Sequence, residues 1–250
     1  TVTKTSGTYD SANAGTGKTV TVALIDTDYV PNAGTSLSNY TLPTSISGAV
    51  GTISKAPITA TGNSTSVTYN GANQTVSGFT VSGLQGSDTV ASLSSVVASG
   101  ATGKNAGSYT NTVTAGTETN YTVSTVNGGL TIAKANATVT ANSGTLTYNG
   151  ANQTVSSFTA SGLVGGETAA VLSGVSASRT EKNAGTYATT ASGTDGNYNL
   201  SFVDGSMRIN KAALTATGNS TSVTYNGANQ TVSGFTVSRS EEHTSELQSP

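Results

Sequence analysis

The strongest constraint in this sequence is a 24-residue segment that occurs twice without a single change, as residues 59–82 and 215–238. A diverged third copy lies between them and keeps the same frame over residues 146–156. The matching tyrosines of the three copies are 79 and then 77 residues apart: Tyr69, Tyr148 and Tyr225. A period of this length is typical of a whole small domain in tandem, because supersecondary repeats are shorter. We therefore expect a tandem array.

The repeat divides the chain into five parts. Residues 1–54 match the back half of a repeat, because Asn13-Ala14-Gly15 corresponds to Asn105-Ala106-Gly107. The predicted parts are this C-terminal piece of a repeat, two complete repeats, the N-terminal piece of a third repeat and a foreign tail: 1–54, 55–133, 134–210, 211–238 and 239–250. Successive repeats join through Lys-Ala, a junction short enough to predict a roughly fixed orientation of neighbours.

Composition favours lean, polar β structure. Only 9% of the residues are charged and 34% are hydrophobic, while Val, Ile and Thr are plentiful. Intrinsic disorder goes with high net charge and few β-branched residues, and the net charge here is only −2. No cysteine is present, which excludes disulfides and thiolate metal sites. No run approaches the roughly 20 apolar residues of a membrane helix.

Alternation of polar and apolar residues predicts short strands throughout both repeats. Tyr109 and Val113 fall on one face of a strand whose other face is rich in Thr. Asn70-Gly71 and its two counterparts predict tight turns between paired strands, because both residues tolerate positive φ. Gly78 marks a bend or bulge. Only residues 83–91 and 162–170 could hold a helical turn. We expect an all-β fold of small domains, each a β-sandwich or, alternatively, a β-grasp-like arrangement.

Several ordered motifs resemble the YDG and MBG repeats of large bacterial surface and secreted adhesins, including filamentous-haemagglutinin-like proteins. In the first complete repeat they are Val67-Thr68-Tyr69-Asn70-Gly71, residues 82–89, Asn105-Ala106-Gly107-Ser108-Tyr109, Asn120-Tyr121-Thr122 and residues 130–135. The second complete repeat carries them again, and residues 1–54 look more like the YDG type. The resemblance covers residues 1–238 and implies an extracellular all-β stalk. It brings no catalytic residues to this chain.

The last twelve residues do not follow the repeat. After Ser238 the first repeat predicts GLQGSDTVASLS, but the chain reads RSEEHTSELQSP. An identity of 24 residues followed by none indicates a splice, and residues 239–250 resemble the translation of a sequencing-library adapter. A genuine polar tail is the alternative. We expect the chain as a whole to be a fragment, since it starts at Thr1 inside a repeat.

Few residues could carry chemistry. His243 is the only histidine and lies in the suspect tail. Asp88 and Glu167 share one repeat position, where we expect a carboxylate that caps a turn or helix N-terminus. A glycosidase pair would need a second acid nearby. Asp26 and Asp28 are too few for a calcium site. We expect no catalytic residues, no cofactor-binding residues, no metal site and no cofactor.

Two further patterns are weaker. Lys104-Asn105 and Lys182-Asn183 suggest an intramolecular isopeptide link, but the sequence places no partner acid beside them. Three triplets fit the N-x-[ST] acceptor pattern, although solvent-facing turn residues are the better interpretation: Asn73-Gln74-Thr75, Asn152-Gln153-Thr154 and Asn229-Gln230-Thr231. Neither basic clusters nor phosphate loops occur, so nucleic acid and small-molecule substrates are not expected partners.

These patterns predict a structural function. We expect spacer repeats of an extracellular adhesin at the bacterial cell surface, presenting a binding region that lies elsewhere in a longer chain. Host glycans or surface proteins would be bound by those other regions. The alternative is that the repeats themselves bind glycan or host protein, which exposed aromatic clusters at equivalent positions of both complete repeats would favour. An enzyme ranks third, because it would need paired acids in a pocket.

Overall fold

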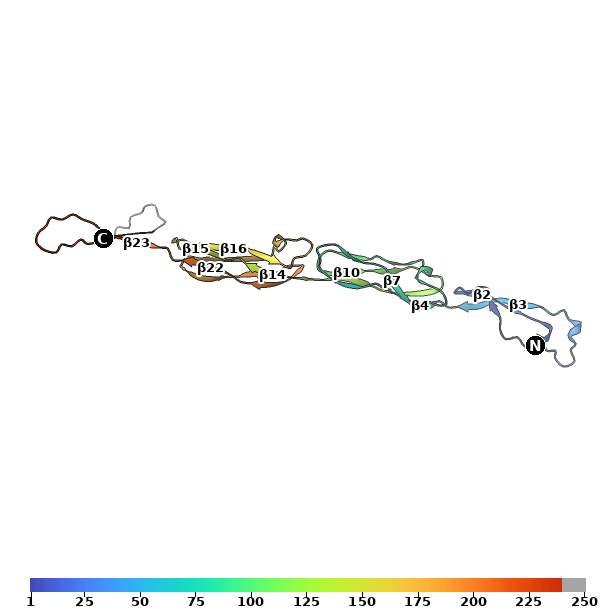
Figure 1. Cartoon of the computed structure of the whole chain (residues 1–250). Helices are drawn as coiled ribbons and strands as arrows, with labels where there is room; N and C mark the ends of the chain where they lie inside the picture. The colour runs from blue at the N-terminus through green and yellow to red at the C-terminus, as the bar shows by residue number, and fades with distance from the viewer. Residues whose placement is uncertain (240–250) are drawn as a thin grey trace. The chain divides into compact units, whose positions relative to one another are not determined.

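The computed structural model describes residues 1–239. These residues form two compact units. The first comprises residues 1–67 and 73–133, and the second comprises residues 68–72 together with the chain from Lys134 onward. Nearly all regular structure is β (Figure 1). The short helices of the described residues are 3₁₀ turns. The prediction of an all-β chain of small tandem domains is confirmed.

The first repeat is the set of strands from β4 to β13. Its strands are short, and the alternating burial along β4 reflects one face on the core and one toward solvent. They are β4 (Ala56–Gly62), β5 (Thr65–Thr68), β6 (Gln74–Val76), β7 (Phe79–Ser82), β8 (Val96–Ala98), β9 (Ala101–Gly103), β10 (Gly107–Asn111), β11 (Val113–Ala115), β12 (Tyr121–Val126) and β13 (Gly128–Ala133).

The second repeat, from β14 to β22, has the same order of strands, with one long strand in place of two. The strand β18 replaces the β8–β9 pair because the second repeat lacks one residue at that bend. Its strands are β14 (Ala135–Ala141), β15 (Gly144–Thr147), β16 (Gln153–Ser156), β17 (Phe158–Ser161), β18 (Val175–Glu181), β19 (Gly185–Thr189), β20 (Ala191–Gly193), β21 (Tyr198–Val203) and β22 (Gly205–Asn210).

Strands exchange partners halfway along each repeat. In one half of the folded repeat, which we call the first half, β4 lies between β12 and β7, and β8 pairs with β11. In the second half, β13 lies between β5 and β10, and β9 pairs with β6. Each repeat is therefore built from small sheets of two or three strands that switch at bends. The pairing of β4 with β12 is parallel, as is that of β14 with β21.

The bends of the first repeat meet around Asn111, whose side chain is completely buried. Its amide nitrogen donates to the carbonyl oxygens of Asn63 (3.2 Å) and Gly78 (2.9 Å). Its amide oxygen accepts from the backbone N–H of Gly100 at 2.9 Å. One side chain thus binds backbone groups of three bends, and the Gly78 carbonyl accepts in addition from the N–H of Asn63 at 3.0 Å. Gly78 has φ 79°, which confirms the predicted bend.

The second repeat has a threonine in place of this asparagine. Thr189 occupies the position of Asn111 and is also completely buried, but its hydroxyl oxygen has no hydrogen-bond partner. The bend that Gly100 makes in the first repeat is absent, so an amide oxygen has no such N–H to accept from. Ser157 stands where the first repeat has Gly78 and keeps its positive φ of 79°. We infer that the second repeat carries local strain at its middle.

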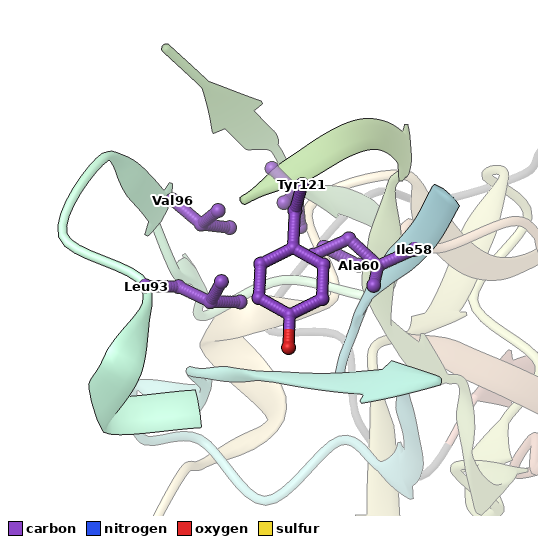
Figure 2. Close-up of a cluster of buried hydrophobic side chains, with 6 residues drawn as sticks. Ile58, Ala60, Leu93, Val96 and Tyr121 are labelled. Carbon is purple, nitrogen blue, oxygen red and sulfur yellow. The ribbon is translucent and has the colours of Figure 1, made fainter. Parts of the chain in front are cut away.

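The core of the first half lies between the two small sheets, as in a sandwich. Tyr121 is surrounded by aliphatic side chains from β4 and from the segment around β8 (Figure 2). The buried cluster consists of Ile58, Ala60, Leu93, Val96, Val113 and Tyr121. Leu93 follows the 3₁₀ turn η3 (Val90–Ser92), and η4 (Ala169–Val171) holds Leu172 in the same way. Each turn overlaps the last two residues of a stretch predicted to hold a helical turn (83–91 and 162–170) and extends one residue beyond it.

Residues 1–54 form a three-stranded antiparallel sheet of β1 (Thr8–Tyr9), β2 (Gly15–Ala23) and β3 (Ser45–Ile53). Two 3₁₀ turns, η1 (Asp26–Asp28) and η2 (Leu37–Asn39), lie between β2 and β3. Gly15 pairs with Ile53. The same Gly–Ile pairing occurs in both complete repeats. Gly107 of β10 pairs with Ile132 of β13, and Gly185 of β19 pairs with Ile209 of β22.

At the other end, β23 (Leu214–Gly218) pairs with β24 (Phe235–Arg239) in the register that β4 and β7 use. The side chains, however, are not buried. Leu214 is 66% exposed, whereas Ile58 at the equivalent position is 3% exposed. Arg239, which the sequence assigned to the foreign tail, is the last residue of β24, and its guanidinium lies 5.2 Å from the ring centroid of Tyr148.

One expectation about the turns is wrong. Gly71, Gly150 and Gly227 do have positive φ, as predicted. The strands that the first of these turns connects are nevertheless not paired with each other, because β5 pairs with β13 and β6 pairs with β9. The Asn-Gly signal specifies the local turn, but the partner exchange places its two strands in different sheets.

The middle of the repeat provides a matched pair of stability predictions. Asn111→Thr should lower the free energy of unfolding of the first repeat by about 2–3 kcal/mol, because buried backbone groups lose their partners. Thr189→Val should raise that of the second by about 1 kcal/mol, because it removes a buried unpaired hydroxyl. Hydrogen–deuterium exchange with mass spectrometry reports on each repeat separately. Two changes of the same sign would contradict our account of the bends.

Identical sequence in two environments gives a second prediction. Residues 67–81 lie in β5 to β7, whereas most of residues 223–237 lie outside strands. Tyr225 is 89% exposed and Tyr69 is 3% exposed. We expect amides of 223–234 to exchange at least about 100-fold faster than those of 67–78, because residues 223–234 form no strand and are exposed. Site-resolved hydrogen exchange measures this directly, and equal protection would show that the third copy folds without a second half.

Candidate functional site

An acidic residue and two tyrosines form a hydrogen-bonded group in the second unit. Tyr69 donates its hydroxyl to one carboxylate oxygen of Glu167 at 2.5 Å, and Tyr198 donates to the other at 2.6 Å. The Tyr198 oxygen also accepts from the backbone N–H of Val164 at 3.0 Å. Tyr69 and Tyr198 are 3% and 2% exposed. We call the pair Glu167 and Tyr198 the acid–tyrosine site of the second repeat.

The turn that carries Tyr69 approaches this site through its backbone. We call residues 68–72 the tyrosine turn. The rings of Tyr69 and Tyr198 meet edge to face, with centroids 5.4 Å apart and an interplanar angle of 83°. A Cβ added to Gly165 would lie 2.9 Å from the carbonyl oxygen of Asn70 and 3.2 Å from Cα of Gly71. A side chain larger than hydrogen at 165 would therefore displace the turn.

The first repeat has the same site at equivalent positions. Tyr121 donates its hydroxyl to Oδ2 of Asp88 at 2.5 Å and accepts from the backbone N–H of Gln85 at 3.1 Å. Gly86, which corresponds to Gly165, has φ 62° against 64° there. A Cβ added to Gly86 would meet no atom within 4 Å. The site is built the same way in both repeats, but only the second has a turn against its glycine.

Hydrogen bonding to a carboxylate shifts the ionisation of these phenols. The hydrogen bond to Glu167, followed by burial, raises the pKa of Tyr69 to about 12 from an ordinary value of 10.0. Burial and then the bond to Glu167 raise the pKa of Tyr198. The bond to Asp88 raises the pKa of Tyr121. A tyrosine held protonated serves as a donor, and nothing in this geometry activates it as a base.

The expected role of Asp88 and Glu167 was wrong in detail. The N-caps of the two 3₁₀ turns are Thr89 and Thr168, and the preceding carboxylates bind tyrosine hydroxyls instead. Sequence reasoning missed these tyrosine partners. A signal was present, because the Gly-x-acid, Asn-Tyr and Tyr-Asn-Gly motifs recur together in both complete repeats.

A second recurrent contact lies where each repeat begins. Lys55 donates to the backbone carbonyl of Glu118 at 2.5 Å, and Lys134 donates to that of Asp195 at 2.8 Å. Glu118 is 6% exposed, and one of its oxygens accepts from the hydroxyl and the backbone N–H of Ser95. The Ser95 hydroxyl, more than any other group, lowers the pKa of Glu118. These carboxylates are used to fix loops.

The remaining acidic and basic candidates have structural positions. Asp28 accepts from the backbone N–H of Ile25 at 3.0 Å, within the turn that also contains Asp26. Lys104 and Lys182 are exposed, and the carbonyls of Asn105 and Asn183 accept from Tyr109 (2.9 Å) and Tyr187 (3.1 Å). The asparagines of the three acceptor triplets are exposed. His243 lies outside the described residues.

Among residues 1–239 no group of three or more His, Cys, Asp and Glu side chains could hold a metal ion. In the same part of the chain no helix has the length and apolarity to cross a membrane. One hollow in the first unit is open to solvent and lined by Leu24, Ile25, Asp26, Thr27 and Thr44. This lining offers one carboxylate and no partner for general acid–base chemistry.

Residues 56–131 and 137–208 each match the MBG domain (YGX type). Together the two matches cover more than half of the sequence. The chain belongs to the MBG domain family. No curated protein matched the chain.

Membership of the MBG family confirms the resemblance read from the sequence motifs. Each MBG match spans the strands of one repeat and includes its acid–tyrosine site. The two sites are therefore features of the MBG unit in this chain and recur with it. The chain is a tandem repeat module, which agrees with the two copies of one strand order.

The acid–tyrosine site makes a third prediction. Tyr69→Phe removes one hydrogen bond to a carboxylate and should lower the free energy of unfolding of the second MBG repeat by about 1.5–3 kcal/mol. Tyr225→Phe is the matched control, because the same residue in the same sequence is exposed there. It should leave both repeats unchanged. Exchange protection of the Val164 and Tyr198 amides is the measurement.

Comparison of the parent protein with Tyr69→Phe also tests the ionisation of Tyr69. Its pKa is raised on folding, from 10.0 to about 12, so its stabilising contribution is complete below pH 10. That contribution disappears as the pH rises through about 12. The difference in stability between the parent and Tyr69→Phe should accordingly shrink between these two values. A difference that stays constant to pH 12 would show that the hydroxyl is not bound to Glu167.

Proposed function

We propose that this chain is a structural spacer from a bacterial extracellular adhesin. Its MBG repeats would separate a binding region elsewhere in the full-length protein from the cell surface. MBG repeats are typical of extracellular proteins, which supports this localisation. Host glycans or surface proteins would be bound by other regions of that protein.

Repetition of one folded unit is the observation that carries the proposal. Each repeat has its own buried side chains, and in the first repeat the central amide of Asn111 is used by the bends of that repeat. One residue, Lys134, connects β13 to β14, and two connect β3 to β4. Successive repeats therefore follow one another in the sequence almost directly. We propose repeat boundaries at 55–133 and 134–210, with partial repeats at 1–54 and 211–238.

A role without catalysis is part of the proposal. The carboxylates that recur in both repeats are used as hydrogen-bond acceptors for tyrosines and loop amides. Charged side chains are few, at 9% of the sequence. A general acid and base facing one substrate would require a second acid in the same hollow, which the lining around Leu24 does not provide.

The alternative is that the repeats themselves bind glycan or protein through aromatic faces. Within the two complete repeats, the recurrent tyrosines have other tasks. Tyr121 and Tyr198 are buried, and Tyr109 and Tyr187 are half-buried and bind turn carbonyls. The more exposed tyrosines, such as Tyr40, lie outside the two complete repeats. No pair of exposed rings at equivalent positions favours this alternative within the described residues.

A binding and deletion experiment tests the spacer proposal. The purified chain should bind neither glycan arrays nor extracellular-matrix proteins. In the intact surface protein, deletion of residues 134–210 should preserve adhesion to a purified receptor but reduce reach, measured by atomic force microscopy. Binding by the isolated chain at micromolar concentration would favour the alternative function. Loss of receptor binding with normal surface display would also contradict a spacer role.

A further inference from the structure

The two acid–tyrosine sites differ in what lies against them. In the second repeat, the tyrosine turn covers Gly165, and its Tyr69 shares Glu167 with Tyr198. In the first repeat, the corresponding glycine, Gly86, faces open space. Asp88 binds Tyr121 through Oδ2 and is exposed, whereas Glu167 is half-buried. The same backbone geometry is present in both copies, so the difference lies in the occupant.

We propose that Gly86, Asp88 and Tyr121 form a docking site for the tyrosine turn of another MBG repeat, the one that precedes it in the full-length array. The occupied site in the second repeat shows the chemistry of the partner. There, the Tyr69 phenol donates to the carboxylate oxygen that does not accept from Tyr198, and its ring packs edge-on against Tyr198. A glycine with positive φ then lets the two backbones come together. This inference deepens the spacer role and rests on it.

The strand order explains why an incoming repeat presents its tyrosine turn at the right end. In sheet β15–β22–β19, Thr147 pairs with Asn210 and Gly185 pairs with Ile209. The turn after β15 and the Asn183-Ala184 turn before β19 therefore leave the sheet at the same end, on either side of β22. β22 itself ends there, so both turns flank the strand that leads into the next repeat.

Residues 1–54 already occupy the neighbouring position in the first unit. The Asn13-Ala14 turn precedes β2, as Asn183-Ala184 precedes β19, and it contacts Asn120. Oδ1 of Asn120 accepts from the Ala14 N–H at 2.9 Å, and its amide donates to Asn13 at 3.1 Å. Asn120 is the residue before Tyr121. One of the two flanking turns is thus seated beside the site.

The second flanking turn is missing from residues 1–54. On the far side of β3, the position that β5 occupies beside β13 has no strand in this three-stranded sheet, since its order is β1–β2–β3. A complete repeat in that place would bring a strand with a tyrosine turn at its end. The turn would arrive next to Asn120, at the uncovered Gly86 face.

The experiment supplies the missing turn within the full chain. A second copy of residues 55–133 is inserted between Ser54 and Lys55, so that a complete repeat precedes the original site. We expect exchange of the original Gln85 and Asp88 amides to slow at least about 10-fold. Ultraviolet titration of phenols should gain a tyrosine whose pKa is raised, because it donates to a carboxylate as Tyr69 does.

Glycine variants provide the controls. Gly86→Val in the original site of the inserted protein should abolish both gains, because its side chain meets the incoming turn. Gly86→Val in the inserted copy is the matched control, since it costs the same backbone strain but faces no tyrosine turn, and it should leave both gains intact. Unchanged exchange and an unchanged titration in the inserted protein would overturn the proposal. The adhesion and reach assays of the spacer role are independent of these readouts.

Discussion

Hydrogen bonding at the middle of each repeat is the constraint on which the rest of this structure depends. A strand that leaves one partner for another exposes N–H and C=O groups at the bend, and buried groups of this kind must be paired. In the first repeat, Asn111 pairs three of them with one amide. Close approach is possible because Gly62 and Gly128 lie there, where a Cβ on either would meet backbone atoms at 2.5 Å or less. The exchange of strand partners is therefore specified by glycines and by a buried asparagine rather than by large apolar side chains.

The same constraint explains how so lean a sequence folds. Switching partners gives two short cores along one repeat, so Ala60 and Ala137 can be buried where a thicker domain would need larger side chains. Threonines lie on the solvent-exposed faces of the strands, where their branched side chains favour extended backbone. Because each core is small, a single polar contact contributes a larger share of the stability of its repeat. The second repeat tolerates an unpaired Thr189 hydroxyl and a positive φ at Ser157, which places it nearer the limit of stability.

Local features of the fold could be predicted from the sequence, whereas the pairing could not. Period-two patterning predicted the strands, and Gly71 and Gly78 have the positive φ that their turns and bends required. The parallel β4–β12 pair joins residues about 65 positions apart, and no local pattern encodes such a partner. The acid–tyrosine site and its contact with Tyr69 were missed for the same reason, because 31 residues separate Glu167 from Tyr198 and 98 separate it from Tyr69. A carboxylate before a 3₁₀ turn looked like a cap because its true partners are distant in sequence.

Two copies of one 24-residue sequence show how much of this fold is non-local. From Thr59 to Ser82 the strands of the segment pair with β12, β13 and β9, and Tyr69 is 3% exposed. From Thr215 to Ser238 the only ladder is β23 with β24, and Tyr225 is 89% exposed. Side chains and local propensities are the same, so the difference arises from strands and from an acidic partner that other parts of the chain supply. Stability in such a repeat is thus a property of completed pairings, and the tyrosine of the turn is buried where the Glu167 carboxylate accepts its hydrogen bond.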